Sequence, residues 1–190
     1  MTGPEVALFF HILGVFLLVG ASSISHLAGA RLRRAETVAE ARTWLGVLKL
    51  VDPLFPGAII VIFGAGAYMV SDVAFFDWDQ AWVSVALGTL IAAGALGGGF
   101  LSRGLRGVMA EAESAEEGPM PASLRRAVLN PVLFAAENVL DLWIIAIMYM
   151  MVDKPNLAGA LAAVLIATAV GAASYVPASK RLEGVEGVEG

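Results

Sequence analysis

Two acidic residues interrupt an otherwise apolar segment of the chain, residues 131–152. Glu137 and Asp141 are four positions apart, so a helix would project both side chains from one face. No lysine or arginine lies inside the predicted apolar segments to neutralise them, and a low dielectric with mutual repulsion favours the protonated form of at least one carboxyl. Such a pair can pass protons or bind a cation, which is the usual meaning of acids within a membrane span. The alternative is a structural role, with both carboxyls hydrogen-bonded to neighbouring helices.

The two histidines, His11 and His26, both fall in the first apolar segment, residues 6–28. A helix rising 1.5 Å per residue places them about 22 Å apart along its axis, so one chain cannot use both for a single metal ion. One interpretation of His26 is an interfacial histidine or a partner of Asp52 or Glu137. The other groups it with the two acids, Glu137 and Asp141, as a candidate proton or ion site.

His11 is the candidate for a second, separate site. We expect it to lie at the same depth in the membrane as Met148 and Met151. Histidine with methionine is a plausible axial pair for haem b, and both residue types also bind copper. The alternative is that the methionines are ordinary packing residues. These three residues are therefore the predicted cofactor site, with haem b or copper as the cofactor.

Apolar helices must position all of these candidates. The chain of 190 residues is 58% hydrophobic and only 15% charged, with a mean hydropathy of +0.79, whereas soluble domains are about one quarter charged. Five apolar segments each approach the ~20 residues that a helix needs to cross a bilayer, and they lack the alternation of barrel strands. The segments are residues 6–28, 53–70, 81–101, 131–152 and 157–176. The sequence thus predicts an all-α bundle of five transmembrane helices over residues 1–182.

The basic residues predict the orientation of this bundle. They lie between the first and second segments, between the third and fourth, and after the fifth: Arg31, Arg33, Arg34, Arg42, Lys49, Arg103, Arg106, Arg125, Arg126, Lys180 and Arg181. The connection between the second and third segments and the one between the fourth and fifth contain four aspartates and a single lysine, Lys154. We expect the protein to lie in the inner membrane of a bacterium. The positive-inside rule then places the N-terminus outside and the C-terminus in the cytoplasm. Because positive charges follow the first segment instead of preceding it, we expect no cleaved signal peptide.

Other features of the sequence narrow the possible functions. The chain has no cysteine, which excludes disulfides, thiolate metal sites and cysteine nucleophiles. Its basic residues form short clusters beside apolar segments, so we expect the lipid bilayer and no nucleic acid as a partner. Residues 103–130 are predicted to form a cytoplasmic loop with an acidic part, Asn130 before Pro131 is typical of a helix start, and the tail, residues 183–190, is predicted to be disordered.

Small residues recur at helical spacing in two of the apolar segments. Gly94 and Gly98 form such a pair in the third segment, and Ala167 and Gly171 form another in the fifth. Small residues four apart let helix backbones approach closely. Packing within the chain is the first interpretation. A homo-oligomer through the glycine-rich third segment and a ligand-facing third helix are the alternatives.

Several short motifs resemble those of a known family. They are Leu-Phe-Phe-His-Ile-Leu-Gly at 8–14, Arg-Leu-Arg-Arg at 31–34, Pro-Gly at 56–57 followed by a glycine at 64, and Met-Tyr-Met-Met-Val-Asp-Lys-Pro at 148–155. Over residues 6–155 the chain resembles a family of predicted bacterial integral membrane proteins of unknown function. In layout this family is similar to copper-resistance membrane proteins and to the haem-dependent protoporphyrinogen oxidase of bacterial membranes. The resemblance carries one residue over, the histidine of the first helix, onto His11. The tryptophan and the Leu-Pro-Arg run that follow this histidine in the oxidase are absent here.

The sequence therefore favours a small multi-pass membrane protein with a buried polar site that handles haem, a metal ion or protons. Two alternatives from other classes stay open. A proton-coupled transporter of a small solute requires water access to the acids. A noncatalytic assembly or scaffold protein requires fully paired acids and a glycine-lined face that is open to another chain.

Overall fold

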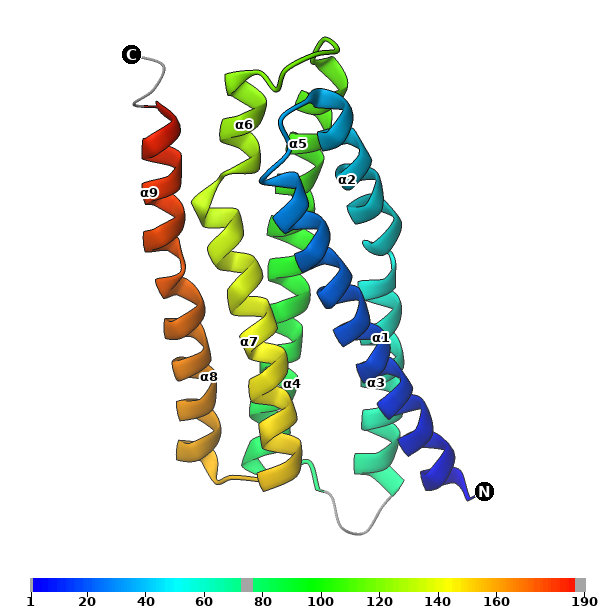
Figure 1. Ribbon diagram of the computed structural model, residues 1–190. Coiled ribbons are helices and arrows are strands. Elements are labelled where there is room, and N and C mark those ends of the chain that lie inside the picture. The colour runs from blue at the N-terminus through cyan, green and yellow to red at the C-terminus, as the bar shows by residue number, and fades with distance from the viewer. Residues whose placement is uncertain (1, 73–76, 187–190) are drawn as a thin grey trace.

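The computed structural model describes residues 2–72 and 77–186, and every regular element in these stretches is a helix. Figure 1 shows long helices side by side, with the N-terminus at the lower end and the C-terminus at the upper end. The elements are α1 (Gly3–Leu32), α2 (Val38–Val51), α3 (Leu54–Asp72), α4 (Ala81–Gly94), η1 (Ala95–Leu101), α5 (Ser102–Ser114), α6 (Ala122–Val128), α7 (Pro131–Asp153), α8 (Leu157–Ala173) and α9 (Tyr175–Glu186).

Five helical stretches in the described part of the chain are long and apolar enough to cross a membrane. They are Gly3–Leu32, Val38–Ser71, Ala81–Ser114, Ala122–Asp153 and Leu157–Glu183. Each contains one predicted apolar segment, so the all-α fold class and the five candidate spans are confirmed. The termini lie at opposite ends (Figure 1), as an odd number of crossings requires. Which end faces the cytoplasm stays a prediction.

Small residues bring the helices together in two close pairs. A Cβ atom on Gly14 of α1 would lie only 2.7 Å from Cγ1 of Ile62 on α3. Likewise, a Cβ atom on Gly171 of α8 would lie 2.7 Å from Cα of Val139 on α7, and Ala167, one turn earlier, is buried. The bundle therefore consists of two groups, α1 with α3, and α7 with α8 and α4.

A compact lobe forms the upper end of the molecule, where α2, α5 and α6 meet the end of α1 (Figure 1). Its buried core, which defines what we call the upper lobe, comprises Leu32, Ala35, Val38, Ala41, Leu45, Val108, Ala112 and Leu124. Arg42 ties the lobe together by donating to the carbonyl oxygens of Ala112 at 3.0 Å and Ala115 at 2.8 Å, and it pairs with Glu117. The predicted loop at 103–130 is thus largely a folded pair of helices.

Two chain segments can be compared directly with the sequence-based expectations. Helix α7 begins where predicted, because the side chain of Asn130 accepts hydrogen bonds from the backbone N–H groups of Val132 at 2.9 Å and Leu133 at 3.3 Å. Helix α9 reaches Glu186, so residues 183–186 of the expected disordered tail continue the helix. Residues 187–190 lie outside the described part of the chain.

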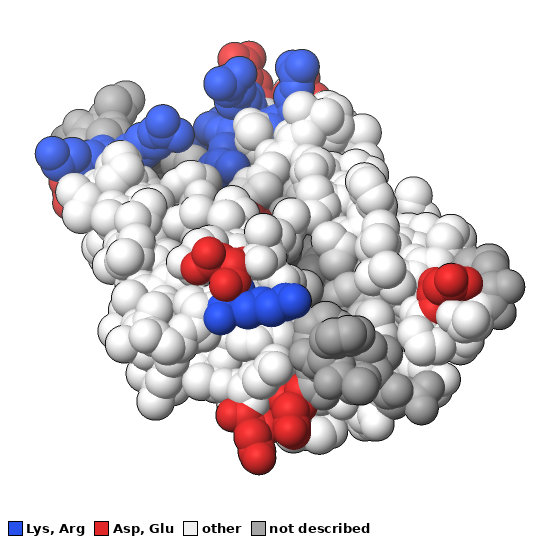
Figure 2. Space-filling view, turned by 90° about the horizontal axis from the view of Figure 1, so that it is seen from below, with Lys and Arg blue, Asp and Glu red and all other residues white. Residues whose placement is uncertain are grey.

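The two ends of the bundle differ in charge. Figure 2 looks at the lower end, where acidic side chains lie at several separate places with one basic side chain beside them, while the other visible lysine and arginine side chains gather along the upper edge of the view together with a few acidic ones. Helix α7 ends at the lower end of the bundle with Asp153, which is followed by Lys154 in a left-handed conformation with φ of 48°. The fold thus keeps apart the two sets of charges on which the predicted orientation rests.

Candidate polar site and cavity

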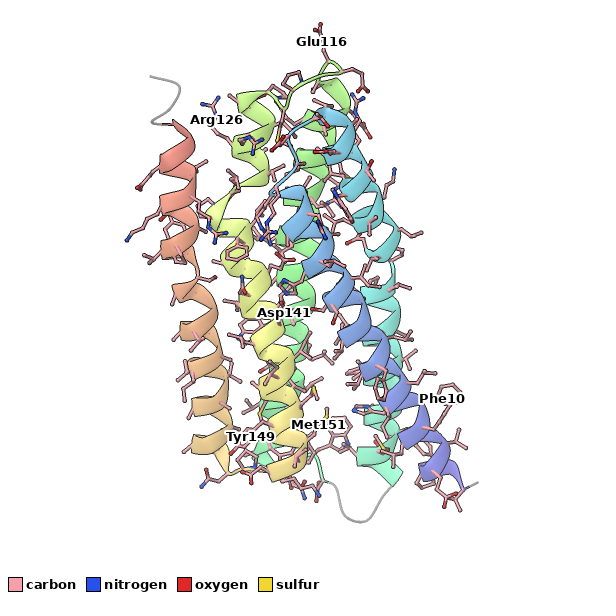
Figure 3. All side chains as sticks on the ribbon, in the orientation of Figure 1. Phe10, Glu116, Arg126, Asp141, Tyr149 and Met151 are labelled. Atoms are coloured by element: carbon pink, nitrogen blue, oxygen red, sulfur yellow. The ribbon has the colours of Figure 1, made fainter. Side chains whose placement is uncertain are left out.

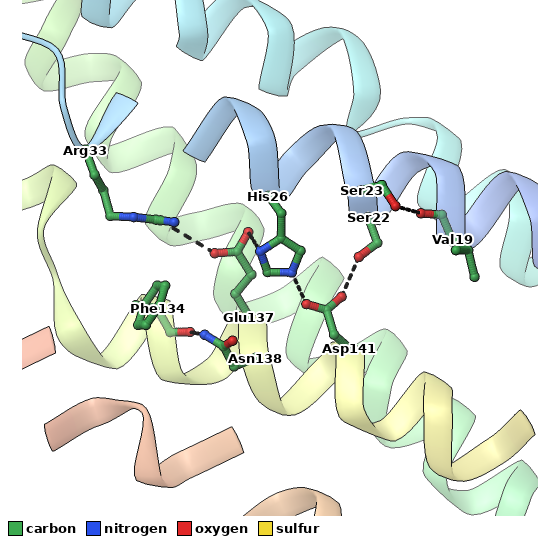
Figure 4. A network of polar contacts seen from close by, with 9 residues as sticks. All are labelled: Val19, Ser22, Ser23, His26, Arg33, Phe134, Glu137, Asn138 and Asp141. Carbon is green, nitrogen blue, oxygen red and sulfur yellow. Dashed lines mark hydrogen bonds and ion pairs between the residues drawn. The ribbon is translucent and has the colours of Figure 1, made fainter. Parts of the chain in front are cut away.

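A row of polar side chains crosses the space between α1 and α7 (Figure 4). Nε2 of His26 is hydrogen-bonded to Oδ2 of Asp141, and Nδ1 of the same ring lies 3.9 Å from Oε1 of Glu137. Ser22 donates to the other carboxylate oxygen of Asp141 at 2.5 Å. The imidazole therefore lies between two carboxylates, each facing a different ring nitrogen.

Arg33 completes this row at its upper end. Its Nη1 lies 3.8 Å from Oε2 of Glu137, and its guanidinium carbon is 4.7 Å from the centre of the Phe134 ring, a cation–π distance. Burial lowers the pKa of Arg33, with Glu137 opposing this effect and Arg181 of α9 adding to it, yet a guanidinium stays charged at neutral pH. We call these five residues the polar bridge: Ser22, His26, Arg33, Glu137 and Asp141.

Helical spacing explains why these residues meet. Ser22 and His26 are four residues apart on α1, and Glu137 and Asp141 are four apart on α7, so each pair shares one helix face. Asp141 lies about midway along the bundle in Figure 3, between Arg126 at the upper end and Met151 near the lower end. The two acidic side chains are only 24% and 25% exposed. The bridge is therefore a partly buried group at the depth of the candidate spans.

A cavity of about 510 Å³ adjoins the polar bridge. Both carboxylates line it, as does Arg33, whereas neither histidine does. Asp52, at the turn between α2 and α3, is a third acidic lining residue. Most of the remaining wall is apolar and comes from α1, α3, α4, η1 and α7. This volume and this mixture of apolar wall and few polar groups are typical of small-molecule sites.

One wall of the cavity is the π-helical segment η1. Its hydrogen bonding is wider than that of an α-helix, because the N–H of Ser102 bonds to the carbonyl of Gly97, five residues earlier. Gly94, Gly97 and Gly98 line the cavity, and a Cβ atom on Gly98 would have no atom within 4 Å. Short π-helical turns within α-helices occur frequently at functional sites. The glycine-rich segment thus faces the cavity, and the homo-oligomer through it stays a prediction.

His11 lies in a different environment from the polar bridge. Its Nδ1–H donates to the carbonyl oxygen of Ile62 at 3.0 Å, and the residue is 8% exposed. Met148 and Met151 line the cavity, but His11 does not. In the described part of the chain, no group of three or more His, Cys, Asp or Glu side chains is arranged to hold a metal ion. A shared haem or copper site at these three residues stays a prediction.

Comparison with known proteins shows the family. The family model described as "Predicted integral membrane protein (DUF2269)" matches residues 5–155. The chain belongs to this family. The predicted resemblance to membrane proteins of unknown function is thereby confirmed, and the chain is a multi-pass integral membrane protein. No curated protein and no solved structure matches the chain.

The matched region of this family member contains the entire polar bridge and all lining residues of the cavity, while α8 and α9 lie beyond it. The bridge is not a hydrolytic arrangement, because Ser22 donates to Asp141 and not to His26, which would have to act as its base. What the bridge can do is hold or release a proton. Arg33 balances one carboxylate, so when both acids are ionised the charge of the second is balanced only if His26 is protonated.

Three of the five bridge residues were grouped from the sequence, and a proton or ion site at them stays a prediction. The structure brings His26, Glu137 and Asp141 together, as grouped in the sequence, with Asp141 as the main partner of the histidine. No lysine or arginine lies inside the apolar segments, as stated above, but Arg33 lies just beyond α1 and its side chain reaches back to Glu137. Ser22 was also missed, although its position one turn before His26 was a usable signal.

Proposed function

We propose that this protein is a proton-coupled carrier of a small solute, in which the polar bridge binds and releases a proton as the cavity empties and fills. The observation that carries the proposal is the imidazole of His26 placed between two carboxylates that line the cavity. Histidine is the side chain that most readily changes charge near neutral pH. A proton on this ring therefore changes the electrostatic interaction of the imidazole with both acids in the cavity wall.

The alternatives from the sequence receive less support. A haem or copper protein needs ligands that converge on one cofactor, and His11 does not line the cavity that Met148 and Met151 line. A scaffold protein needs an outward glycine face, and three of the five glycines in residues 81–101 line the cavity. The membrane that we propose is the inner membrane of a bacterium, with the upper lobe in the cytoplasm.

Histidine NMR tests the proton-binding step. The chain has only two histidines, so the variant His11→Gln, purified without a histidine tag, has a single imidazole, that of His26. In nanodiscs with isotope-labelled histidine, we expect the His26 signal to titrate between about pH 5 and about pH 9. The titration should shift in Asp141→Asn, because the direct partner of the ring loses its charge.

A matched variant gives the control for this experiment. Asp153 also accepts a hydrogen bond, from Tyr149 at 2.7 Å, but lies at the lower end of α7 outside the cavity wall. We expect Asp153→Asn to leave the His26 titration unchanged. A His26 signal that is constant over this pH range, or that ignores Asp141→Asn, would refute the proposed proton coupling.

A further inference from the structure

The charge of the cavity wall indicates which solute fits. Four charged residues line it, one basic and three acidic: Arg33, Asp52, Glu137 and Asp141. His26, which can balance Asp141, is not part of the wall. A solute inside the cavity therefore meets an excess of negative charge.

Arg33 does not offer an anion a comparable place. Its guanidinium is paired with Glu137 and lies over the ring of Phe134, so an anion would have to displace a carboxylate that the chain itself provides. Arg181 on α9, whose charge acts on Arg33, is not among the lining residues of the cavity. An anionic solute would instead face Asp141 and Asp52.

The rest of the wall is apolar. Examples are Leu18 on α1, Ile62 on α3, Leu90 on α4 and Ile144 on α7. A solute surrounded by such side chains gains by burying apolar surface, while a small hydrated inorganic ion would have to give up its water without enough polar partners. The body of the solute should therefore be apolar and its charge single and localised at the acids.

We infer that the cavity binds an amphipathic organic monocation, whose positive charge takes the place of the proton on His26 beside Glu137 and Asp141. This inference rests on the proposed function, because it uses His26 as the exchangeable positive charge. When His26 is protonated, the bridge residues are balanced among themselves. When it is neutral, one negative charge is available for the solute. The groups that face His26 are Asp141 and Glu137 from α7 and Arg33 beyond the end of α1.

Two probe ions of the same shape and opposite charge test this inference. Tetraphenylphosphonium is a cation and tetraphenylborate an anion, and both are apolar outside the central atom. Equilibrium dialysis against protein in phosphatidylcholine nanodiscs, with empty nanodiscs subtracted, measures saturable binding of each. We expect saturable binding of the phosphonium ion that tightens as pH rises, and its loss by about tenfold or more in Asp141→Asn, with Asp153→Asn unchanged.

A variant that fills the cavity separates binding inside it from binding elsewhere on the bridge. Gly98 lines the cavity with open space at its Cβ position, so Gly98→Leu places a side chain where the solute would lie. We expect this variant to lose phosphonium binding. An unchanged His26 NMR titration in the same preparation would show that its fold and bridge are intact.

The outcomes distinguish a failure of this inference from a failure of the proposed function. If His26 titrates but the phosphonium ion does not bind saturably, the organic-cation inference is overturned while proton coupling stands. Equal binding of both ions, insensitive to Asp141→Asn, would identify the cavity as a space for lipid chains and overturn the inference. Phosphonium binding that depends on Asp141, without any His26 titration, would refute the coupling and support only a cation site.

Discussion

The upper lobe and the cavity region are built from different parts of the same four candidate spans, yet they are held together in different ways. In the upper lobe, Leu124 and Val38 are 0% exposed, and Arg42 bonds to backbone carbonyls across the core. In the cavity region, α1 and α7 are connected by the polar bridge, with about 510 Å³ of space beside it. The comparison suggests that packing in the lobe and within the helix pairs stabilises the fold, which leaves the bridge free to change its charge.

The largest expected effect comes from damage to the upper lobe. Leu124→Ala removes a side chain that is 0% exposed, and such a change costs about 2–5 kcal/mol in the free energy of unfolding. Denaturant or thermal unfolding in detergent, followed by circular dichroism, measures this loss. The control is Leu50→Ala, because Leu50 is 76% exposed. Equal losses for both variants would contradict the special role of the lobe.

The next effect concerns the close pair of α7 and α8. Gly171→Ala adds a Cβ atom at 2.7 Å from the backbone of Val139, so the two helices must move apart at a cost of about 1–3 kcal/mol. The same unfolding measurement applies. Gly20→Ala, at a position where a Cβ atom meets nothing within 4 Å, is the matched control on α1 and should not destabilise the fold. A stable Gly171→Ala variant would show that this contact is not tight.

A smaller effect is expected within the polar bridge. Ser22→Ala removes the hydrogen bond to Asp141, which is worth about 0.5–1.5 kcal/mol in the free energy of unfolding. The same variant should shift the His26 titration, because Asp141 loses one of its two partners. Ser23→Ala, whose hydroxyl donates to the carbonyl of Val19 on the same helix, should leave that titration unchanged. A loss as large as that of Leu124→Ala would remove the contrast between the two regions.

The smallest effect on stability is expected at the cavity wall. Gly98→Ala places a methyl group in open space, so the free energy of unfolding should change by no more than about 0.5 kcal/mol. The comparison with Gly171→Ala tests whether the space beside the bridge is real. A destabilisation similar to that of Gly171→Ala would mean that neighbouring side chains fill this space.

Apolar length and charge bias were enough to predict the helical fold and the five candidate spans, since both are properties of single segments. The pairing of His26 with Asp141 was less accessible, because it depends on the rotation of α1 relative to α7. Arg33 was missed for a related reason, since a segment boundary does not limit how far a long side chain reaches. The division into two helix groups with a cavity between them depends on long-range packing, which no local pattern encodes.

The π-helical segment η1 has one consequence for the register of the third span. Bonding to the fifth preceding residue accommodates one more residue in the turn than an α-helix would hold, so residues after Leu101 are rotated relative to a continuous α-helix. Removal of a single residue among Gly97, Gly98 and Gly99 would restore regular bonding and turn α5 by about 100° relative to α4. Val108 and Ala112 would then leave the core of the upper lobe, so the length of this short stretch keeps the lobe-facing side of α5 in register with the cavity-facing side of η1.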